Sequence, residues 1–245
     1  AGVFKHLRLT EYESKISDTY YSFGWSDGLS KRIPMPATLL MRFRKKYKYK
    51  KNKIKVLYCT TDIPQNIFSL PLEINYYSSY MNWQRQFLNA LSSNVFNDLV
   101  IRPHREDSGR NMKAHLQSSV YSKITFEGWD KTFSKSLHKS LLYIGDHCST
   151  TYVIALAMNV PTVLYWDTKF IEHTDHADIE IQKLKNVGIF HDSPESAAKH
   201  INSIFHNVYD WWLSDEVQSA KNSFCYKYAR TDKNALKLWK NELLS

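Results

Sequence analysis

The sequence predicts an α/β fold, in which a Rossmann-like parallel sheet carries helices on both faces. Short apolar runs, such as 54–59, 98–101 and 161–166, alternate with segments of helical periodicity. Runs that are apolar on both faces are typical of parallel strands buried between helices. We therefore expect one doubly wound, nucleotide-binding domain over residues 51–245. Residues 1–50 are expected to form an interdomain or linker segment with one helix.

The order of the expected elements follows from periodicity and from the residues that begin and end helices. Thr10, with Glu13 three positions later, has the pattern of a capping box, and Ser193-Pro194 has that of a helix start. Residues 172–189 are mostly polar and are assigned no helix. The expected strands are 54–59, 98–101, 124–126, 141–144, 161–166 and 188–190, and the expected helices are 10–21, 76–91, 133–140, 152–158, 194–205, 216–228 and 233–244.

Composition restricts the class of protein. A chain of 245 residues with 43% hydrophobic and 14% aromatic residues is long and apolar enough to bury a core. Its three cysteines, Cys59, Cys148 and Cys225, form no CxxC pair, which indicates reduced thiols and a cytoplasmic protein. No membrane-spanning stretch or signal peptide is visible. Because the chain begins at Ala1 rather than Met, we expect further residues upstream.

The net charge of +9 is concentrated in residues 42–53, where cations alternate with aromatic residues. A solvated linker is the simpler interpretation of this run. The alternative is a patch that contacts a polyanionic acceptor or the anionic inner surface of the cell membrane from the cytoplasmic side. No nucleic-acid partner is expected.

Polar clusters follow two of the predicted strands, at 102–107 and 146–151. If both strands belong to one parallel sheet, the two clusters open at its carboxyl edge, where such sheets bind ligands. Arg102 and Arg105 have the bidentate geometry that suits a phosphate. The alternative for this cluster is a surface group in which the cations pair with Glu106 and Asp107.

The second cluster lies at the expected start of a helix. The hydroxyls of Ser149, Thr150 and Thr151 and the free backbone N–H groups there suit an anion. Simple N-capping is the alternative, and the two roles are compatible. Asp146 adds a carboxylate that could contact a ribose. His147 stands alone, and a lone loop histidine is more often solvated than catalytic.

A third cluster combines His173, Asp175, His176 and Asp178. Imidazole and carboxylate at short spacing can ligate zinc or manganese, but no further ligand pattern supports this, and we predict no metal site. The sequence also lacks a P-loop, GxGxxG, a nucleophile elbow and HExxH. These absences argue against kinases, simple dehydrogenases, α/β-hydrolases and zincins.

Several motifs together resemble a family of sugar transferases found in bacterial O-antigen and surface-polysaccharide loci. They are DHCSTT at 146–151 with the following ALA, NVPT and YW, then VGIFHDSPE at 187–195, ISD and FGW within 16–25, and LYCTTD at 57–62. The resemblance covers nearly the whole chain. It implies the C-terminal half of a GT-B glycosyltransferase, in which two Rossmann-like domains face each other.

The resemblance also implies residue roles. The donor, a nucleotide-sugar, would contact Arg102, Arg105, Asp146, His147, Ser149, Thr150, Thr151 and Thr61, and His104 and Asp107 would be catalytic. Related enzymes that use CMP-activated sugars have a His-Pro pair, whereas this chain has Pro103-His104. No metal or cofactor is required, because cations and helix N-termini stabilise the departing phosphate.

The acceptor implied by the resemblance is a glycan or a lipid-linked glycan. The general base would come from the other domain, so this chain alone is expected to bind donor weakly and to turn over nothing. Two alternatives remain open: a non-catalytic module that binds a nucleotide or polyanion, and a sugar-nucleotide epimerase of GT-B type.

Overall fold

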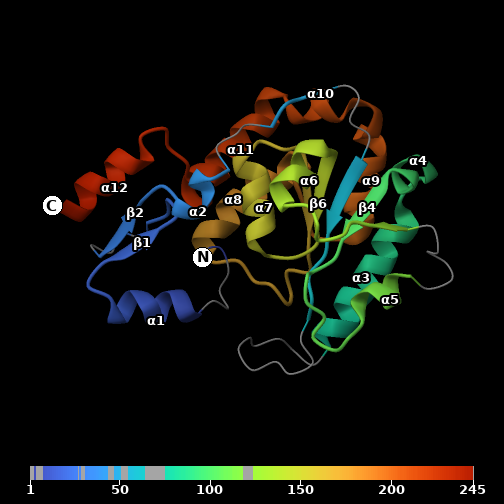
Figure 1. The fold of residues 1–245 in the computed structure, drawn as a ribbon, viewed down its shortest axis with the longest axis horizontal. Helices are drawn as coiled ribbons and strands as arrows, with labels where there is room; N and C mark the ends of the chain where they lie inside the picture. Colours follow the sequence, from blue (N-terminus) through green and yellow to red (C-terminus); the bar gives the residue numbers. More distant parts are fainter. Residues whose placement is uncertain are drawn as a thin grey trace.

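The computed structural model describes residues 3, 8–26, 28, 31–43, 47–50, 55–63, 75–117 and 124–244. A six-stranded, wholly parallel sheet forms its centre (Figure 1), and this confirms the predicted fold class. The strand order is β5-β4-β3-β6-β7-β8. The strands are β3 (Lys55–Cys59), β4 (Leu99–Arg102), β5 (Thr125–Phe126), β6 (Ser140–Gly145), β7 (Thr162–Tyr165) and β8 (Phe190–His191).

The direction in which the chain adds strands reverses once. From β3 it proceeds outward through β4 to β5, and it then returns to add β6, β7 and β8 on the other side of β3. β3 and β6 are therefore neighbours, with Val56 of β3 paired to Leu99 on one side and Leu142 on the other. The chain leaves the carboxyl ends of these two strands toward opposite faces, and doubly wound sheets bind their ligands at such a point.

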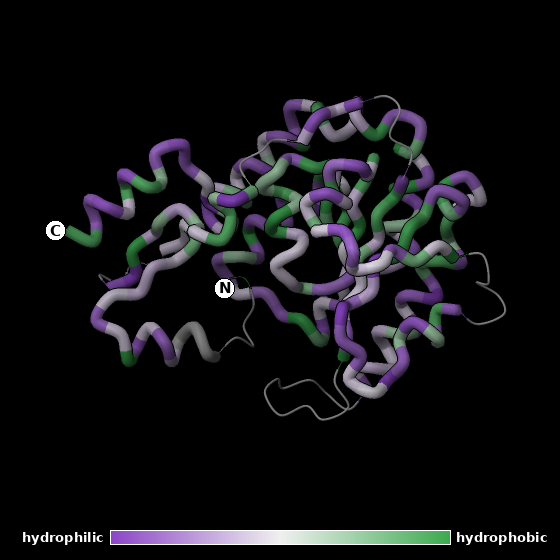
Figure 2. Tube along the Cα trace, viewed as in Figure 1, coloured by the Kyte–Doolittle hydropathy of each residue, from purple (hydrophilic) through white to green (hydrophobic). Residues whose placement is uncertain are grey.

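Alternation along the strands divides the core into two layers. Leu57 and Tyr143 face the layer that holds α7 (Thr150–Ala157), α8 (Asp175–Asn186) and α11 (Asp215–Tyr228). Val56 and Leu142 face the layer that holds α3 (Tyr76–Ala90) and α9 (Pro194–Ile204). Figure 2 shows apolar stretches gathered where the strands lie. The shorter helices are α4 (Ser93–Asn97), α5 (Met112–Leu116), α6 (Phe133–Lys139) and α10 (Val208–Trp212), with a 3₁₀ turn at Phe205–Asn207.

Helix boundaries agree with the capping chemistry at three places. The Ser193 hydroxyl accepts a hydrogen bond from Ser196 N–H at the start of α9, as the Ser-Pro signature predicts. Ser149 caps α7 in the same way. Thr174 caps α8, a helix that the sequence analysis missed, because residues 172–189 look polar. One stripe of α8 is nevertheless buried, and it includes Ala177, Ile181 and Leu184.

The N-terminal segment differs from expectation. The predicted helix 10–21 is α1 (Arg8–Ile16), so Thr10 lies inside the helix and is not its N-cap. Residues beyond it form β1 (Tyr20–Ser22), which pairs in parallel with β2 (Arg32–Pro34), and α2 (Thr38–Met41) follows. Short polar strands of three residues carry too little periodicity to be recognised from sequence.

Contacts cross the boundary predicted at residue 50, and the division into a linker and a domain stays a prediction. Tyr47 N–H donates to the Met158 carbonyl, and the Tyr47 hydroxyl donates to the Ser140 carbonyl. Lys48 and Lys50 are exposed beside it, so the aromatic residue faces the protein and the cations face solvent. Arg42 is exposed as well, and the other cations of the basic run, at 44–46 and 51–53, lie outside the described residues.

The last helix, α12 (Ala235–Leu244), packs on the N-terminal segment (Figure 1). The Trp239 ring lies 4.9 Å from that of Tyr21, and Trp239 Nε1 donates to the Pro36 carbonyl at 2.9 Å. The described helices include none with the length and apolarity needed to cross a bilayer.

Gly24 lies where the N-terminal segment meets the end of α11. Its φ is +122°, and a Cβ there would lie 2.3 Å from the Tyr226 carbonyl oxygen. We expect Gly24→Ala to lower the free energy of unfolding by about 3 kcal/mol, through backbone strain and overpacking together. Urea denaturation measures this loss.

Gly28→Ala is the matched control. Gly28 also has positive φ, at +83°, but nothing lies within 4 Å of the added Cβ. This substitution is expected to cost only the backbone strain, about 1 kcal/mol. Equal losses in the two variants would contradict the close approach at Gly24.

Candidate functional site

The candidate site lies at the carboxyl ends of β3 and β6, where the strand order reverses. Thr60 and Thr61 follow β3, and Asp146 and His147 follow β6. Because neighbouring parallel strands end at the same edge, these residues come together although more than 80 positions separate them in sequence. The structure thus joins two of the sequence-predicted positions, Thr61 and the 146–151 cluster.

Asp146 is the centre of this site. The carboxylate is buried, and its Oδ2 accepts hydrogen bonds from the hydroxyl of Tyr58 at 2.6 Å and that of Tyr80 at 2.9 Å. Gln84 Nε2 donates to the same oxygen at 2.8 Å. The other oxygen, Oδ1, lies 2.8 Å from His147 Nδ1. One carboxylate therefore fastens β3 and α3 to the end of β6.

The protonation states of the tyrosines suit this arrangement. Burial raises the pKa of Tyr58 and of Tyr80 well above the usual phenol value, and the negative charge of Asp146 raises both further. Each hydroxyl therefore keeps its proton and can donate it to the carboxylate. Tyr58 also lies 2.7 Å from the hydroxyl of Tyr165 on β7, which extends the network across three strands.

Asp146 also fixes the imidazole of His147. A carboxylate can only accept, so the proton of the neutral ring is on Nδ1 and Nε2 is left as an acceptor. In the part of the chain that the structure describes, Nε2 has no hydrogen-bond partner. His147 is buried rather than solvated, contrary to the simpler interpretation of the sequence. An oriented imidazole of this kind can hold or move a proton at Nε2.

The start of α7 supplies hydroxyls and backbone donors beside His147. Ser149 Oγ accepts from Thr151 N–H at 3.3 Å and lies 2.6 Å from Thr151 Oγ1, so these two hydroxyls contact each other. Tyr143 donates to Thr151 Oγ1 at 2.9 Å. The Thr150 residue is exposed. N-capping is therefore confirmed, and the partial positive charge of the helix start adds to the site.

The loop after β3 is tied to the same centre. Thr61 N–H donates to the Tyr80 hydroxyl at 3.0 Å, and that hydroxyl in turn donates to Asp146. Three buried atoms nearby have no hydrogen-bond partner among the described residues: Thr60 Oγ1, Asp62 Oδ1 and Gln84 Oε1. A buried polar atom without a partner costs free energy that a polar ligand or water can offset.

Arg102 lies differently from expectation. Its guanidinium is buried and pairs with Glu127 at 2.7 Å, not with Glu106 or Asp107. It also donates to the Lys131 carbonyl at 3.0 Å and lies 4.2 Å from the centre of the Trp129 ring. The side chain points to the sheet face, toward the connection between β5 and α6. A phosphate-binding role for Arg102 stays a prediction.

Residues 104–107 of the cluster are exposed on the loop after β4. Asp107 Oδ1 accepts from three backbone N–H groups, those of residues 109, 110 and 111, each at 2.9 Å. His104 Nδ1 lies 3.2 Å from the carbonyl oxygen of Glu106. The observed role of Asp107 is thus to stabilise its own loop, and the catalytic roles of His104 and Asp107 stay predictions, as does donor contact by Arg105.

Sequence reasoning missed four residues of the site, namely Tyr58, Tyr80, Gln84 and Asp62. Asp62 joins the loops after β3 and β4, because its Oδ2 accepts from Ser108 N–H at 2.8 Å. The first three lie inside an apolar strand or an amphipathic helix, where they look like ordinary core or surface positions. Gln84 is the residue that could have indicated the site, because it falls on the apolar face of the predicted helix 76–91. A glutamine that is buried at such a position requires a polar partner.

The histidine and aspartate residues at 173–178 have other contacts. His173 Nε2 accepts from Trp166 Nε1 at 3.0 Å, and His173 Nδ1 lies 3.5 Å from Asp178. Within the described ranges, no three histidine, cysteine, aspartate or glutamate residues are gathered as metal ligands.

Comparison with known proteins identifies the class. A doubly wound sheet with a polar site at its point of reversal is an architecture typical of nucleotide-binding enzymes. Residues 2–243 match the LIC12162 family transferase, and the chain belongs to this family of transferases. The resemblance to a transferase family is thereby confirmed. No curated protein matches the chain.

Three of the similar solved structures are of the wall teichoic acid polymerase TagF. Its structure is 12% identical with a TM-score of 0.43, and the match covers 97% of this chain and 59% of that one. A TagF variant is 11% identical with a TM-score of 0.46, and the match covers 97% of this chain and 60% of that one. The same variant soaked with CDPG for 30 minutes is 11% identical with a TM-score of 0.43, and the match covers 97% of this chain and 58% of that one. The chain spans under two thirds of the length of these structures.

We expect Asp146→Ala to lower the free energy of unfolding by about 3 kcal/mol, because it leaves several buried donors without an acceptor. Chemical denaturation at neutral pH measures the loss. Asp210→Ala is the control: Asp210 is exposed in the first turn of α10, and its loss is expected to cost less than about 1 kcal/mol. A loss at Asp146 no larger than at Asp210 would mean that the network does not hold the site together.

Arg102→Met is expected to destabilise the protein by about 3 kcal/mol, since it leaves the half-buried Glu127 carboxylate unpaired. The double variant with Glu127→Met should recover part of this loss in a double-mutant cycle. Arg105→Met, at an exposed position, is expected to stay within about 0.5 kcal/mol of the parent. Additive effects of the two substitutions would rule out a coupled pair.

Proposed function

We propose that this chain is the donor-binding half of a glycosyltransferase. In this proposal the enzyme moves a sugar from a nucleotide-sugar to a surface-polysaccharide or O-antigen acceptor, without a bound metal. Membership of a transferase family supports the reaction class. The observation that carries the proposal is the Asp146 network, which holds an oriented histidine beside the start of α7, at the reversal point of a Rossmann-type sheet.

The donor phosphates would lie at the start of α7. Exposed Thr150 and the first N–H groups of the helix can donate to them, and the helix dipole favours their negative charge. Ser149 and Thr151 support this contact by holding the helix start. Thr61, on the loop after β3, would face the same ligand from the neighbouring strand.

In this proposal the nucleoside is recognised by the three buried oxygen atoms that have no hydrogen-bond partner among the described residues. Thr60 Oγ1 can donate or accept, Asp62 Oδ1 can only accept, and Gln84 Oε1 is an amide acceptor. Ribose hydroxyls and base amino groups are donors that would satisfy such acceptors.

His147 is the side chain with the strongest support for chemistry at the reacting centre. With Nδ1–H held by Asp146, Nε2 can accept a hydrogen bond from the donor or, once protonated, stabilise the departing phosphate. His104 and Asp107 remain further candidates on the loop after β4. The base that activates the acceptor would come from outside this chain, as would most of the acceptor site.

The acceptor in this proposal is a glycan or lipid-linked glycan, and the enzyme works in the cytoplasm. Peripheral contact with the anionic inner face of the membrane would use the basic segment, of which Lys48 and Lys50 are exposed.

Nucleotide binding tests this function. Titration calorimetry with CMP, UDP and GDP is expected to show one that binds with a dissociation constant between roughly 1 μM and 1 mM. His147→Gln should weaken this binding by about tenfold, because the oriented imidazole is lost. His206→Gln, at an exposed position far along the chain, is the control and should leave it unchanged.

Absence of affinity for all three nucleotides would overturn the proposal. Affinity without sugar transfer, once the complete enzyme is assayed with a lipid-linked glycan, would favour a non-catalytic binding module. Conversion of a UDP-sugar to its epimer would favour an epimerase.

A further inference from the structure

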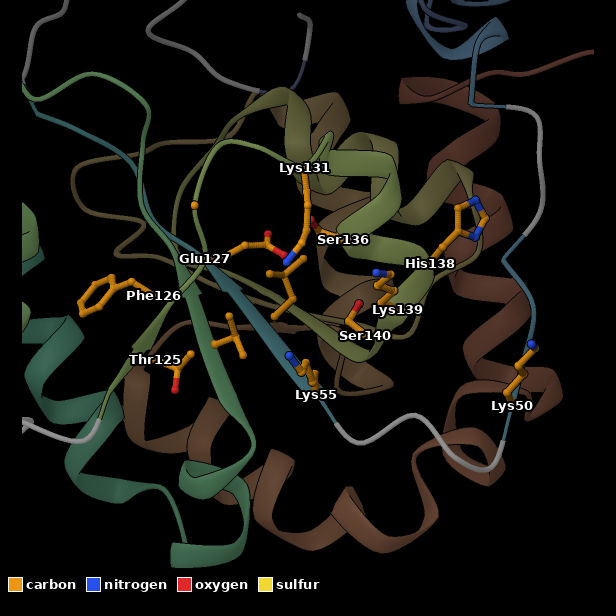
Figure 3. A pocket seen from close by; sticks show the side chains of 13 residues that line it. Lys50, Lys55, Thr125, Phe126, Glu127, Lys131, Ser136, His138, Lys139 and Ser140 are labelled. Atoms are coloured by element: carbon orange, nitrogen blue, oxygen red, sulfur yellow. The ribbon is translucent and has the colours of Figure 1, made fainter.

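A second, separate pocket lies on one face of the sheet. It has a volume of about 480 Å³ and opens between the strands β3, β4 and β5 and helix α6 (Figure 3). Leu57, Val100 and Phe126 give it an apolar floor. The pocket exists because α6, with seven residues, is only about 10 Å long and covers part of this face.

The walls of this pocket are strongly basic. Four lysines line it, from four segments of the chain: Lys50, Lys55, Lys131 and Lys139. Figure 3 shows Lys55 on β3, Lys131 before α6 and Lys139 at the end of α6. All four are exposed, and none forms an ion pair with a carboxylate of the described residues. Their charges are therefore available to an anion from solvent.

The one carboxylate among the described lining residues does not neutralise these lysines. Glu127 pairs with Arg102 at 2.7 Å, and Arg102 Nη1 also lies 3.4 Å from the hydroxyl of Ser136. Arg102 thus contacts two residues that line the pocket, Glu127 and Ser136, and its positive charge compensates the negative charge of Glu127. The pocket keeps an excess of positive charge over an apolar floor.

The pocket differs in position from the donor site. Lys55 and Ser140, which line it, begin β3 and β6, whereas Asp146 follows the end of β6. Six residue steps separate Ser140 from Asp146, which corresponds to roughly 20 Å. The pocket also opens on the sheet face that α6 covers and to which Leu57 points, while Tyr58, which contacts Asp146, points to the opposite face.

We propose that this pocket binds a small phosphorylated molecule with an apolar or ring-shaped body. Its volume lies in the range of sites for small ligands, about 300–1,000 Å³. Lysine ammonium groups on separate segments can surround a phosphate, and the floor of Leu57 and Val100 can bury an apolar body. A nucleotide and an isoprenoid phosphate share this chemistry.

Phenyl phosphate is the probe, because it carries one phosphate on an apolar ring and is neither a nucleotide nor a lipid. Titration calorimetry is expected to show that phenyl phosphate binds more tightly than inorganic phosphate. The double variant Lys55→Glu, Lys139→Glu should weaken its binding by about tenfold or more. Because both lysines are exposed, thermal unfolding should show an unchanged fold.

The control has the same change of net charge elsewhere. Lys199 on α9 and Lys237 on α12 are exposed and do not line the pocket, so the double variant Lys199→Glu, Lys237→Glu should alter the affinity less than about twofold. Equal weakening by the two double variants would overturn the proposal, because it would indicate a general effect of charge. Equal affinities for phenyl phosphate and inorganic phosphate would also overturn it.

Competition identifies the source of the ligand and separates this site from the donor site. Geranyl phosphate that displaces phenyl phosphate indicates a lipid phosphate, and CMP that does so indicates a nucleotide. His147→Gln should leave phenyl phosphate binding unchanged. Loss of binding in that variant, with no effect of the lysine substitutions, would place the ligand at the donor site and overturn the proposal.

Discussion

A buried carboxylate that needs several donors at once is the constraint on which this structure depends. Asp146 is placed by the end of β6, yet its hydrogen-bond partners come from β3, α3 and the next residue along the chain. These elements must therefore meet in one arrangement before the charge is satisfied. Thr61 and His147 are consequently held at the point where the strand order reverses, through Tyr80 and Asp146.

Arg102 and Arg105 show how one short segment contributes to two regions of the protein. Arg102 ends the strand and turns to the sheet face, where Glu127 and Trp129 enclose it. Arg105, three residues later, is exposed at the carboxyl edge. Arg102 takes the side that alternation along β4 gives it, whereas Arg105 lies on the loop beyond the strand. A basic cluster that is continuous in sequence is thus divided between two regions of the protein.

Sequence reasoning succeeded where local signals were strong. Apolar runs located all six strands of the main sheet, and Ser149 and Ser193 marked helix starts. It failed where the decisive partner was distant. In the sequence Tyr58 has no feature that distinguishes it from other residues of an apolar strand, because its partner Asp146 lies 88 positions away. The ion pair of Arg102 spans 25 positions and crosses from one strand to the next connection. Helix α8 was missed because buried Glu180, which pairs with Lys183 and Lys227, makes its core face look polar.

The small sheet of β1 and β2 has a consequence for the order of folding. Its residues are covered by the chain's last helix, through Tyr21 with Trp239 and through Pro36 with Trp239, contacts that span more than 200 positions. Contacts of such long range form late, because the intervening chain must first be ordered. During synthesis, residues 20–37 cannot make these contacts until residues 226–242 have left the ribosome. This small sheet is thereby made before the helix that covers it and is among the last described parts to reach its native packing.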